Sequence, residues 1–402
     1  MDGDLRIRTE RTRPHDCAAL GPRRHDFRRR FAPFDPCFER RDLVKGGNPP
    51  DSSGQVGTLD AIPGFTRADV TYHNVITEWH ATNPAANTFE GTRRELLRVA
   101  HVVSNFVHPF GHLEFNPTAK PGAPDYGLLY TSGSDLGFSN GGGPNASNPS
   151  QTQRLDTVIG AILRIDPRSP SVTGGMKGLG DYTIPTVNKF AADGDPKTLG
   201  EIYAYGFRNA HRLSWDLTDG TMFASDIGMN NIEEINIVHE GNNYGWMKRE
   251  GTFENGVTRP GGTLSQLYPL APEVLDGRMK DGFTYPVAMY DHREGQAVTD
   301  GFPYHGRIPA LRGKFVFGDI VRGRIFVADL AAMKKADDGI PQTVAPVEEV
   351  RRGASTHIEA GRHDPDAGSG FGRHGEVRRT PMTRPPPSCS CPSVKEVARL
   401  TF

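Results

Sequence analysis

One pattern recurs three times in this chain: GLLYTSGSDLG at 127–137, TMFASDIG at 221–228 and KFVFGDIV at 314–321. In each, a short apolar run ends in a small residue followed by an aspartate: Asp135, Asp226 and Asp319. The aspartates are 91 and 93 residues apart, which we interpret as about two four-stranded units per repeat. Four-stranded sheets arranged around a central channel, a β-propeller, would produce this recurrence and protect their edges. A β-sandwich is the structural alternative.

The regions around this repeat favour an all-β fold. The chain has 402 residues with 47 Gly and 32 Pro, together about a fifth of the total, which indicates many turns and few long helices. Short apolar or aromatic runs alternate with Gly, Pro, Asn and Asp, as expected for strands joined by turns. The predicted strands are 70–79, 95–103, 112–115, 127–131, 158–165, 202–205, 213–215, 221–224, 232–238, 314–317 and 324–327.

The two ends of the chain differ from its middle. All four cysteines, Cys17, Cys37, Cys389 and Cys391, lie near the ends, so neither a disulfide framework nor a cysteine-ligated metal is expected between them. Residues 1–55 and 353–402 are basic and lack apolar periodicity. We therefore expect a disordered basic segment at 1–55, an ordered body at 56–352, and a disordered Gly/Arg/Pro-rich segment at 353–402. A nucleic-acid-binding arm is the other interpretation of the arginine doublets at the start.

Charge and hydropathy argue against nucleic-acid binding and against a membrane-spanning segment. The formal net charge is −1 and mean hydropathy is −0.52, so the sequence predicts neither nucleic-acid binding nor a membrane span. The opening MDGDLRIRTE lacks the apolar core of a secretory signal, so no export signal is expected there.

Two stretches are more specific than composition can explain. EIYAYGFRNAHRLSWD (Glu201–Asp216) is followed by SDIGMNNIEEINIVHEGNNYGW (Ser225–Trp246). HPFGHLEFNP (His108–Pro117) lies upstream, and IPALRGKFVFGDIVRGRIF lies downstream. In this order, the series resembles the soluble quinoprotein glucose/sorbosone dehydrogenases, including the aldose sugar dehydrogenases. The resemblance covers about residues 70–350 and implies a six-bladed β-propeller that binds pyrroloquinoline quinone (PQQ) and calcium at the mouth of its channel.

The resemblance assigns catalysis to His108. Oxidising a sugar hydroxyl requires a base for the O–H proton and an acceptor for the hydride, which a quinone supplies. His108 stands in the His-x-x-Gly block, whose histidine is the general base in the family. An imidazole suits this role because its ordinary pKa lies near neutral pH.

Further residues match cofactor and substrate positions of the family. Arg208 and Asn209 match an Arg-Asn pair that contacts the quinone, and a guanidinium is an appropriate partner for the carboxylates of PQQ. Arg322 lies beside the position of a cofactor-contacting lysine, and Tyr285 resembles an aromatic residue beside the substrate. The alternative for Arg208 and Asn209 is an Arg-Asn turn after the strand at 202–205.

Calcium is implied at Gly228 and Met229. These two residues align with positions whose backbone carbonyls hold Ca²⁺ in the glucose dehydrogenases, and hard oxygen ligands suit that ion. The nearby acids do not have the spacing of an EF-hand.

The resemblance weakens towards both ends. The opening strands of the family are not recognisable in residues 1–69, and neither is the closing segment after 350, so we expect a propeller that is incomplete at its first blades and at ring closure. Three functions are compatible with this pattern: a sugar dehydrogenase, a non-catalytic propeller that binds protein or carbohydrate as in the related hedgehog-interacting proteins, and an inactive partial domain. The family works in the periplasm or outside the cell. The sugar, the electron acceptor, the oligomeric state and the compartment are left open.

Overall fold

The structure, a computed structural model, describes residues 36–41, 72–83, 85–101, 108–140, 151–351 and 354–358. Strands dominate this part of the chain, which confirms the all-β prediction. Its α-helices are α3 (Pro170–Thr173), α4 (Pro272–Leu275) and α5 (Leu330–Ala336), and 3₁₀ turns cover 138–140, 151–153, 256–258 and 309–311. No helix within the described residues is long and apolar enough to cross a membrane.

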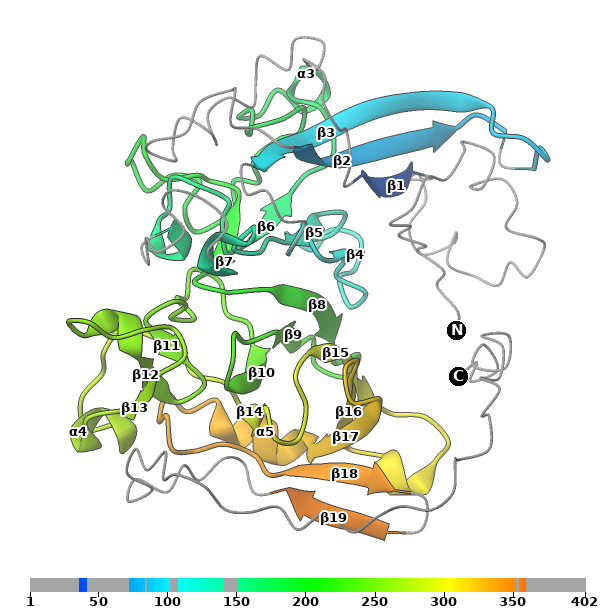
Figure 1. Cartoon of the computed structure of the whole chain (residues 1–402). Helices are drawn as coiled ribbons and strands as arrows, with labels where there is room; N and C mark the ends of the chain where they lie inside the picture. The colour runs from blue at the N-terminus through cyan, green and yellow to red at the C-terminus, as the bar shows by residue number, and fades with distance from the viewer. Residues whose placement is uncertain are drawn as a thin grey trace, which may run out of the picture.

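Three antiparallel sheets form the body of the fold and follow one another along an arc (Figure 1). Each begins with its innermost strand, and the order across each sheet follows the chain. The first contains β4 (Leu113–Phe115), β5 (Leu129–Ser132), β6 (Ala161–Ile165) and β7 (Ile202–Tyr205). The second contains β8 (Ala210–Trp215), β9 (Met222–Asp226), β10 (Ile232–Ile237) and β14 (Ala288–Asp291). The third contains β15 (Val298–Tyr304), β16 (Lys314–Asp319), β17 (Arg324–Asp329), β18 (Val347–Arg351) and β19 (Ala354–Ile358).

Two smaller sheets accompany the three blades. One joins β1 (Pro36–Arg41), β2 (Tyr72–Ala81) and β3 (Gly91–His101) at one end of the arc, and the other joins β11 (Arg249–Glu250), β12 (Phe253–Asn255) and β13 (Leu267–Pro269). The second small sheet is inserted between β10 and β14. This insertion and the long segment between β6 and β7 lengthen the blades, so the 91- and 93-residue spacings correspond to one blade each. The prediction of two units per repeat is wrong for that reason.

Apolar side chains fill the spaces between successive sheets. Tyr130 and Ile162 of the first blade pack with Leu213 and Trp215 of the second in one cluster. Phe223, Ile235 and Ile237 of the second blade share another cluster with phenylalanines of the third. All residues of β5, β6 and β9 are buried, which is expected for strands covered on both faces. Burial of these faces holds neighbouring blades together.

The blades do not close a ring within the described residues. β8 lies against β15 along the inner side of the arc, while the β1–β3 sheet and the β18–β19 pair lie at its opposite ends (Figure 1). The sheets that the structure describes thus form an incomplete propeller, in agreement with the sequence.

Two strands lie where the sequence predicts no regular structure. β1 pairs with β2 from Pro36↔His80 to Arg41↔Val75, and β19 pairs with β18 from Val347↔Ile358 to Arg351↔Ala354. These strands fall inside the segments 1–55 and 353–402, so for residues 36–41 and 354–358 the expectation of disorder does not match the structure. Neither strand has a strong alternating pattern, and pairing with a neighbour defines it. The rest of both segments, which contains Cys17, Cys389 and Cys391, lies outside the described residues. The limits of the ordered body at 56 and 352 stay a prediction.

Candidate functional site

The repeated aspartates anchor the innermost strands of the blades. Asp226 is buried at the end of β9, and its carboxylate accepts the backbone N–H groups of Arg208 (3.1 Å) and Asn209 (2.6 Å), just before β8. Asp319 is buried at the end of β16 and accepts two consecutive N–H groups just before β15, at 2.6 and 2.8 Å. In the second and third blades, the repeated aspartate therefore accepts backbone N–H groups that precede the first strand of the blade.

In the first blade, the same aspartate position serves a histidine. Asp135 is fully buried, and its Oδ1 lies 2.6 Å from Nδ1 of His108. The backbone N–H groups of Gly137 (2.9 Å) and Ser139 (3.3 Å) also donate to this carboxylate. Burial by itself would raise the pKa of Asp135, but the interaction with His108 outweighs burial and holds that pKa below its ordinary value.

The backbone around His108 holds this imidazole in place. His108 has a φ of 51°, which is uncommon for a non-glycine residue, and its carbonyl oxygen accepts the hydroxyl of Ser134. Gly111 follows in the same block, and a Cβ there would overlap Ser132 and the carbonyl oxygen of His211. A strained residue next to a close backbone approach is typical of a functional site.

Arg208 lies next to this histidine–aspartate pair, and its guanidinium is almost fully buried. Nη1 donates to the carbonyl oxygens of Ile227 (2.9 Å) and Gly228 (2.6 Å), and Nη2 lies 3.2 Å from Sδ of Met229. The guanidinium carbon is 5.7 Å from the ring centroid of Trp246, within cation–π range. Contacts from the following loop and from Trp246 therefore fix its orientation.

The structure brings His108, Arg208 and Asn209 together. The Asp135 N–H donates to the carbonyl oxygen of Arg208 at 2.7 Å, and Ser134 forms a β-bridge with Asn209. Within the described part of the chain, neither Nε2 of His108 nor the side-chain amide of Asn209 makes a hydrogen bond, although both residues are mostly enclosed. The residues that carry these two groups are linked through the backbone of Ser134 and Asp135. Polar groups without a partner among the described residues are a property of ligand sites.

Arg322 lies at the same end of its own sheet. It is exposed in the turn between β16 and β17, and its backbone N–H donates to Oδ1 of Asp319 at 2.7 Å. Since Asp226 and Asp319 hold equivalent places in adjacent sheets, the Arg322 turn corresponds to the turn after Asp226, which carries Gly228.

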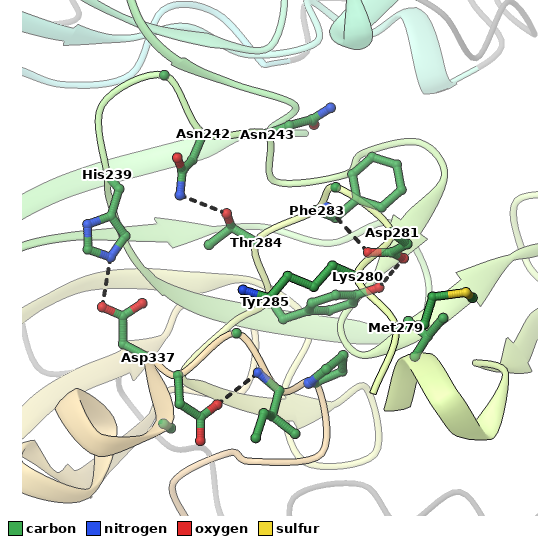
Figure 2. Close-up of a pocket in the computed structure, with 18 of the residues that line it drawn as sticks. His239, Asn242, Asn243, Met279, Lys280, Asp281, Phe283, Thr284, Tyr285 and Asp337 are labelled. Atoms are coloured by element: carbon green, nitrogen blue, oxygen red, sulfur yellow. Dashed lines mark hydrogen bonds and ion pairs between the residues drawn. The ribbon is translucent and has the colours of Figure 1, made fainter. Parts of the chain in front are cut away.

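Tyr285 is not brought to the other predicted residues. It lies in a separate cavity of about 450 Å³ whose lining contains none of His108, Arg208, Asn209 and Arg322 (Figure 2). Its hydroxyl donates to Asp281 at 2.6 Å and accepts from Nε of Arg249 at 3.2 Å. Sequence similarity placed Tyr285 beside the substrate, but the chain path from α4 to β14 carries it away from the His108 corner.

The calcium prediction at Gly228 and Met229 does not fit the donor groups present. The Gly228 carbonyl oxygen, a predicted ligand, already accepts the positively charged Arg208 guanidinium. Glu250, the nearest buried carboxylate, is occupied by backbone N–H groups of the same loop. No cluster of three or more His, Cys, Asp or Glu suited to a metal occurs among the described residues. A divalent cation would have to displace a guanidinium that already neutralises these oxygens.

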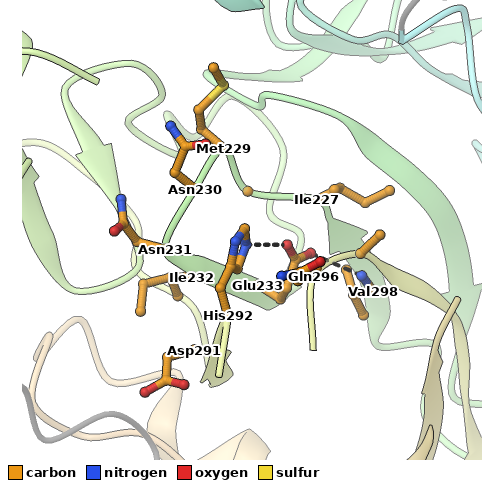
Figure 3. Close-up of polar contacts among 12 residues, drawn as sticks. Ile227, Met229, Asn230, Asn231, Ile232, Glu233, Asp291, His292, Gln296 and Val298 are labelled. Carbon is orange, nitrogen blue, oxygen red and sulfur yellow. Dashed lines mark hydrogen bonds and ion pairs between the residues drawn. The ribbon is translucent and has the colours of Figure 1, made fainter. Parts of the chain in front are cut away.

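Sequence reasoning missed a second histidine–carboxylate pair. Nε2 of His292 lies 2.8 Å from Oε1 of the fully buried Glu233, whose other oxygen accepts the Val298 N–H at 2.9 Å (Figure 3). Burial raises the pKa of Glu233, and the charges of His292 and Arg208 oppose that shift. The signal available in the sequence was a pair of acids at 233–234, which the pattern alone also permits as a solvated face.

Asp226 and Glu234 lie opposite each other on β9 and β10. Burial raises the pKa of Asp226 to about 7 and that of Glu234 to about 8, with smaller effects of Glu233 on Asp226 and of Asp226 on Glu234. Arg208 lowers the pKa of Asp226. The guanidinium therefore partly opposes the effect of burial on this carboxyl.

Two titratable residues lie at and just before β4. Burial, with a smaller effect from Arg212, lowers the pKa of His112 to about 3. Burial and the charge of Asp300 raise the pKa of Glu114 to about 8. Burial therefore favours the uncharged form of both the imidazole before β4 and the carboxyl within it.

Taken together, the fold and the site define a class: an incomplete β-propeller with an oriented histidine and a buried Arg-Asn pair at one end of its blades. Residues 124–361, more than half of the chain, match the model of the "Glucose / Sorbosone dehydrogenase" family. The chain belongs to this family, as its motifs predict.

Known relatives and a solved structure each resemble part of the chain. It is 28% identical over 267 residues to the HIPL1 protein of Arabidopsis thaliana, covering 62% of this chain and 34% of that protein. It is 31% identical over 216 residues to the HIPL2 protein of the same plant, covering 51% and 28%. The chain thus spans about a third of the length of these curated relatives. The PQQ-bound aldose sugar dehydrogenase of Streptomyces coelicolor is 19% identical, with 72% of this chain and 60% of that one covered at a TM-score of 0.39.

Proposed function

We propose that the protein oxidises a hydroxyl of an aldose or related sugar with PQQ as cofactor, and that His108 is the general base. One observation carries the proposal: His108 is oriented by a buried carboxylate at 2.6 Å, and its other ring nitrogen makes no hydrogen bond among the described residues. The backbone of Asp135 and Ser134 joins this pair to Arg208 and Asn209. A base held by one nitrogen and open at the other is the arrangement that proton abstraction requires.

The proposed roles follow from the contacts of each residue. His108 would accept the hydroxyl proton at Nε2, and the Asp135 carboxylate would stabilise the imidazolium that forms. Arg208, Asn209 and Arg322 would hold the carboxylates and carbonyls of PQQ, for which a buried guanidinium and an unpaired amide are suitable donors. PQQ, when bound, supplies the quinone that accepts the hydride from the sugar carbon.

Calcium and Tyr285 have no step in this proposal. The Gly228 carbonyl is bonded to Arg208, and Tyr285 lies in the cavity of Figure 2. A carbohydrate substrate and an external electron acceptor are proposed partners, and their identities are open.

A reconstitution experiment tests the proposal. The purified chain is titrated with PQQ, with and without calcium, and its dye reduction is followed with a panel of aldoses. We expect saturable PQQ binding, activity with at least one aldose, and a loss of about a hundredfold or more in kcat for His108→Gln. Absence of PQQ binding by the folded chain would refute the enzyme function, whereas activity of His108→Gln within tenfold of the wild type would place the base elsewhere.

A second candidate is a non-catalytic propeller that binds protein or carbohydrate. It is favoured by the incomplete ring of described sheets and by relatives whose names, HIPL1 and HIPL2, state no reaction. A folded chain that binds an aldose or oligosaccharide without binding PQQ would support it. An inactive partial domain would bind neither.

A further inference from the structure

The segment after β9 wraps around one buried carboxylate oxygen. Oε1 of Glu250 accepts four consecutive backbone N–H groups, from residues 229, 230, 231 and 232, at 3.0, 3.2, 3.0 and 3.1 Å. The second oxygen, Oε2, lies 3.4 Å from the side-chain amide of Asn231. Glu250 is fully buried and belongs to the separate β11–β13 sheet. Four amides that converge on one anion form a nest of the kind that binds anionic groups, here occupied by the protein itself.

The other side of the same segment faces Arg208. With its N–H groups turned towards Glu250, the segment presents the carbonyl oxygens of Ile227 and Gly228 to Nη1 of Arg208. Met229 adds a sulfur contact to Nη2. Gly228 is required at this turn because a Cβ would overlap the carbonyl oxygen of Ile232 and press on Glu250. The segment is therefore bonded on one side to a buried anion and on the other to a buried cation.

Arg208 depends on this arrangement for its orientation. Its side-chain hydrogen bonds to the 227–229 segment end at backbone oxygens and a thioether, so the carbonyl directions of that segment contribute to where the guanidinium lies, together with the contact to Trp246. Without the carboxylate, four N–H groups, one buried and three part-buried, would lose their acceptor. The segment would then rearrange to pair them with water or other groups.

We propose that Glu250 is a positioning residue for Arg208, acting through residues 227–232. This inference rests on the proposed function in one respect, namely that Arg208 binds the carboxylates of the cofactor. In the apo protein, Glu250 sets the guanidinium direction, and the preorganised guanidinium then contributes to cofactor affinity. Glu250 does not contact the cofactor.

Hydrogen exchange of the apo protein tests the first half of the proposal. In Glu250→Gln the amides of residues 229–232 should exchange at least about tenfold faster than in the wild type, since a neutral amide oxygen holds four N–H groups less strongly than a carboxylate. Glu250→Asp, which keeps the charge, should restore part of the protection. Glu201→Gln is the matched control: Glu201 is also buried and accepts a backbone N–H, from Leu179 at 3.1 Å, but it contacts Tyr182 in the first blade. Unchanged exchange at 229–232 in Glu250→Gln would overturn the proposal.

A double-mutant cycle on PQQ affinity tests the second half. Glu250→Gln should weaken PQQ binding by about tenfold, and Arg208→Met should weaken it further. If Glu250 acts through Arg208, adding Glu250→Gln to Arg208→Met should change affinity by less than about twofold. Additive losses would overturn the proposal by showing that Glu250 acts independently of Arg208.

The two measurements separate failure of this inference from failure of the proposed function. If the wild type binds no PQQ, the proposed function fails, and the near-ultraviolet circular dichroism of Trp246, beside Arg208, replaces affinity as the readout of the cycle. The cycle is then read in the same way: loss of the Glu250→Gln effect in the Arg208→Met background supports the coupling, and its persistence overturns it.

Discussion

Replacing Asp135 by asparagine is the most direct test of the candidate site. The asparagine has nearly the same shape but keeps only one oxygen, which can accept the Gly137 N–H at Oδ1 or the Ser139 N–H at Oδ2 but not both. It also removes the negative charge that pairs with His108 at 2.6 Å. A hydrogen bond between charged groups contributes about 1.5–3 kcal/mol net, and an uncharged amide is less costly to bury, so we expect a loss of about 2 kcal/mol in the free energy of unfolding at pH 7.

The pH dependence of this loss has a definite sign. The pKa of Asp135 is lower in the folded protein than the value of 3.8 for an unperturbed aspartate. A lowered pKa contributes stability that is present above the unfolded pKa and is lost as the pH falls through the folded pKa. The difference between wild type and Asp135→Asn should therefore shrink as the pH falls below about 4. Urea denaturation at a series of pH values measures it.

The catalytic consequence is larger than the structural one. An imidazole that loses its orienting carboxylate should lose most of its function as a base, so kcat should fall about a thousandfold. Asp216→Asn is the control, since Asp216 is also fully buried and pairs with His305 and Lys334 at the opposite end of β8. It should lower stability without lowering kcat. A stable Asp135→Asn protein with wild-type kcat, or equal losses of kcat in both variants, would refute the reasoning.

Three further changes test separate parts of the structure. Burial raises the pKa of Glu234 from 4.5 to about 8, so the free energy of unfolding should fall as the pH rises from about 4.5 to 8. Glu234→Gln should remove on the order of 2 kcal/mol of this fall. An unchanged dependence of the free energy of unfolding on pH would contradict the assignment. Gly228→Ala should lower the free energy of unfolding by about 2 kcal/mol because the new methyl group overlaps the Ile232 carbonyl oxygen. A melting temperature that does not fall in calorimetry would show this reasoning to be wrong. Tyr285→Phe should cost about 1 kcal/mol through the lost bond to Asp281 and leave kcat/KM for aldoses within twofold, whereas a selective rise in KM would return Tyr285 to the substrate site.

The strands that the sequence located best are rich in apolar and aromatic residues. The prediction of 202–205 matches β7, and those at 232–238 and 221–224 match β10 and β9 within two residues. The strands that it did not locate include β12 and β18, in which polar residues are frequent and burial is partial. An apolar run therefore predicts a strand whether the fold buries one face or both, whereas a polar strand is defined by its pairing.

The site was predictable to the extent that its residues lie in local motifs. His108, Arg208 and Asn209 each stand in a recognisable block, and the structure places them together. Tyr285 also stands in a recognisable step, yet it lies in another cavity, because an inserted sheet and α4 alter the path before β14. Asp135 was visible only as a member of the repeat, and its pairing with His108 depends on how β4 and β5 align.

By itself, the sequence determined the all-β class, the repeated aspartate at the end of the second strand in each blade, and the His-x-x-Gly and Arg-Asn blocks. These are local features, set by side-chain alternation, turn residues and short-range hydrogen bonding. Only the tertiary structure decided that one repeat is one blade, that Asp135 orients His108, and that Glu250 and Arg208 hold opposite sides of one segment. Such pairings join residues up to tens of positions apart, and they form only when packing between sheets removes water, so that each buried charge must be stabilised by groups of the protein.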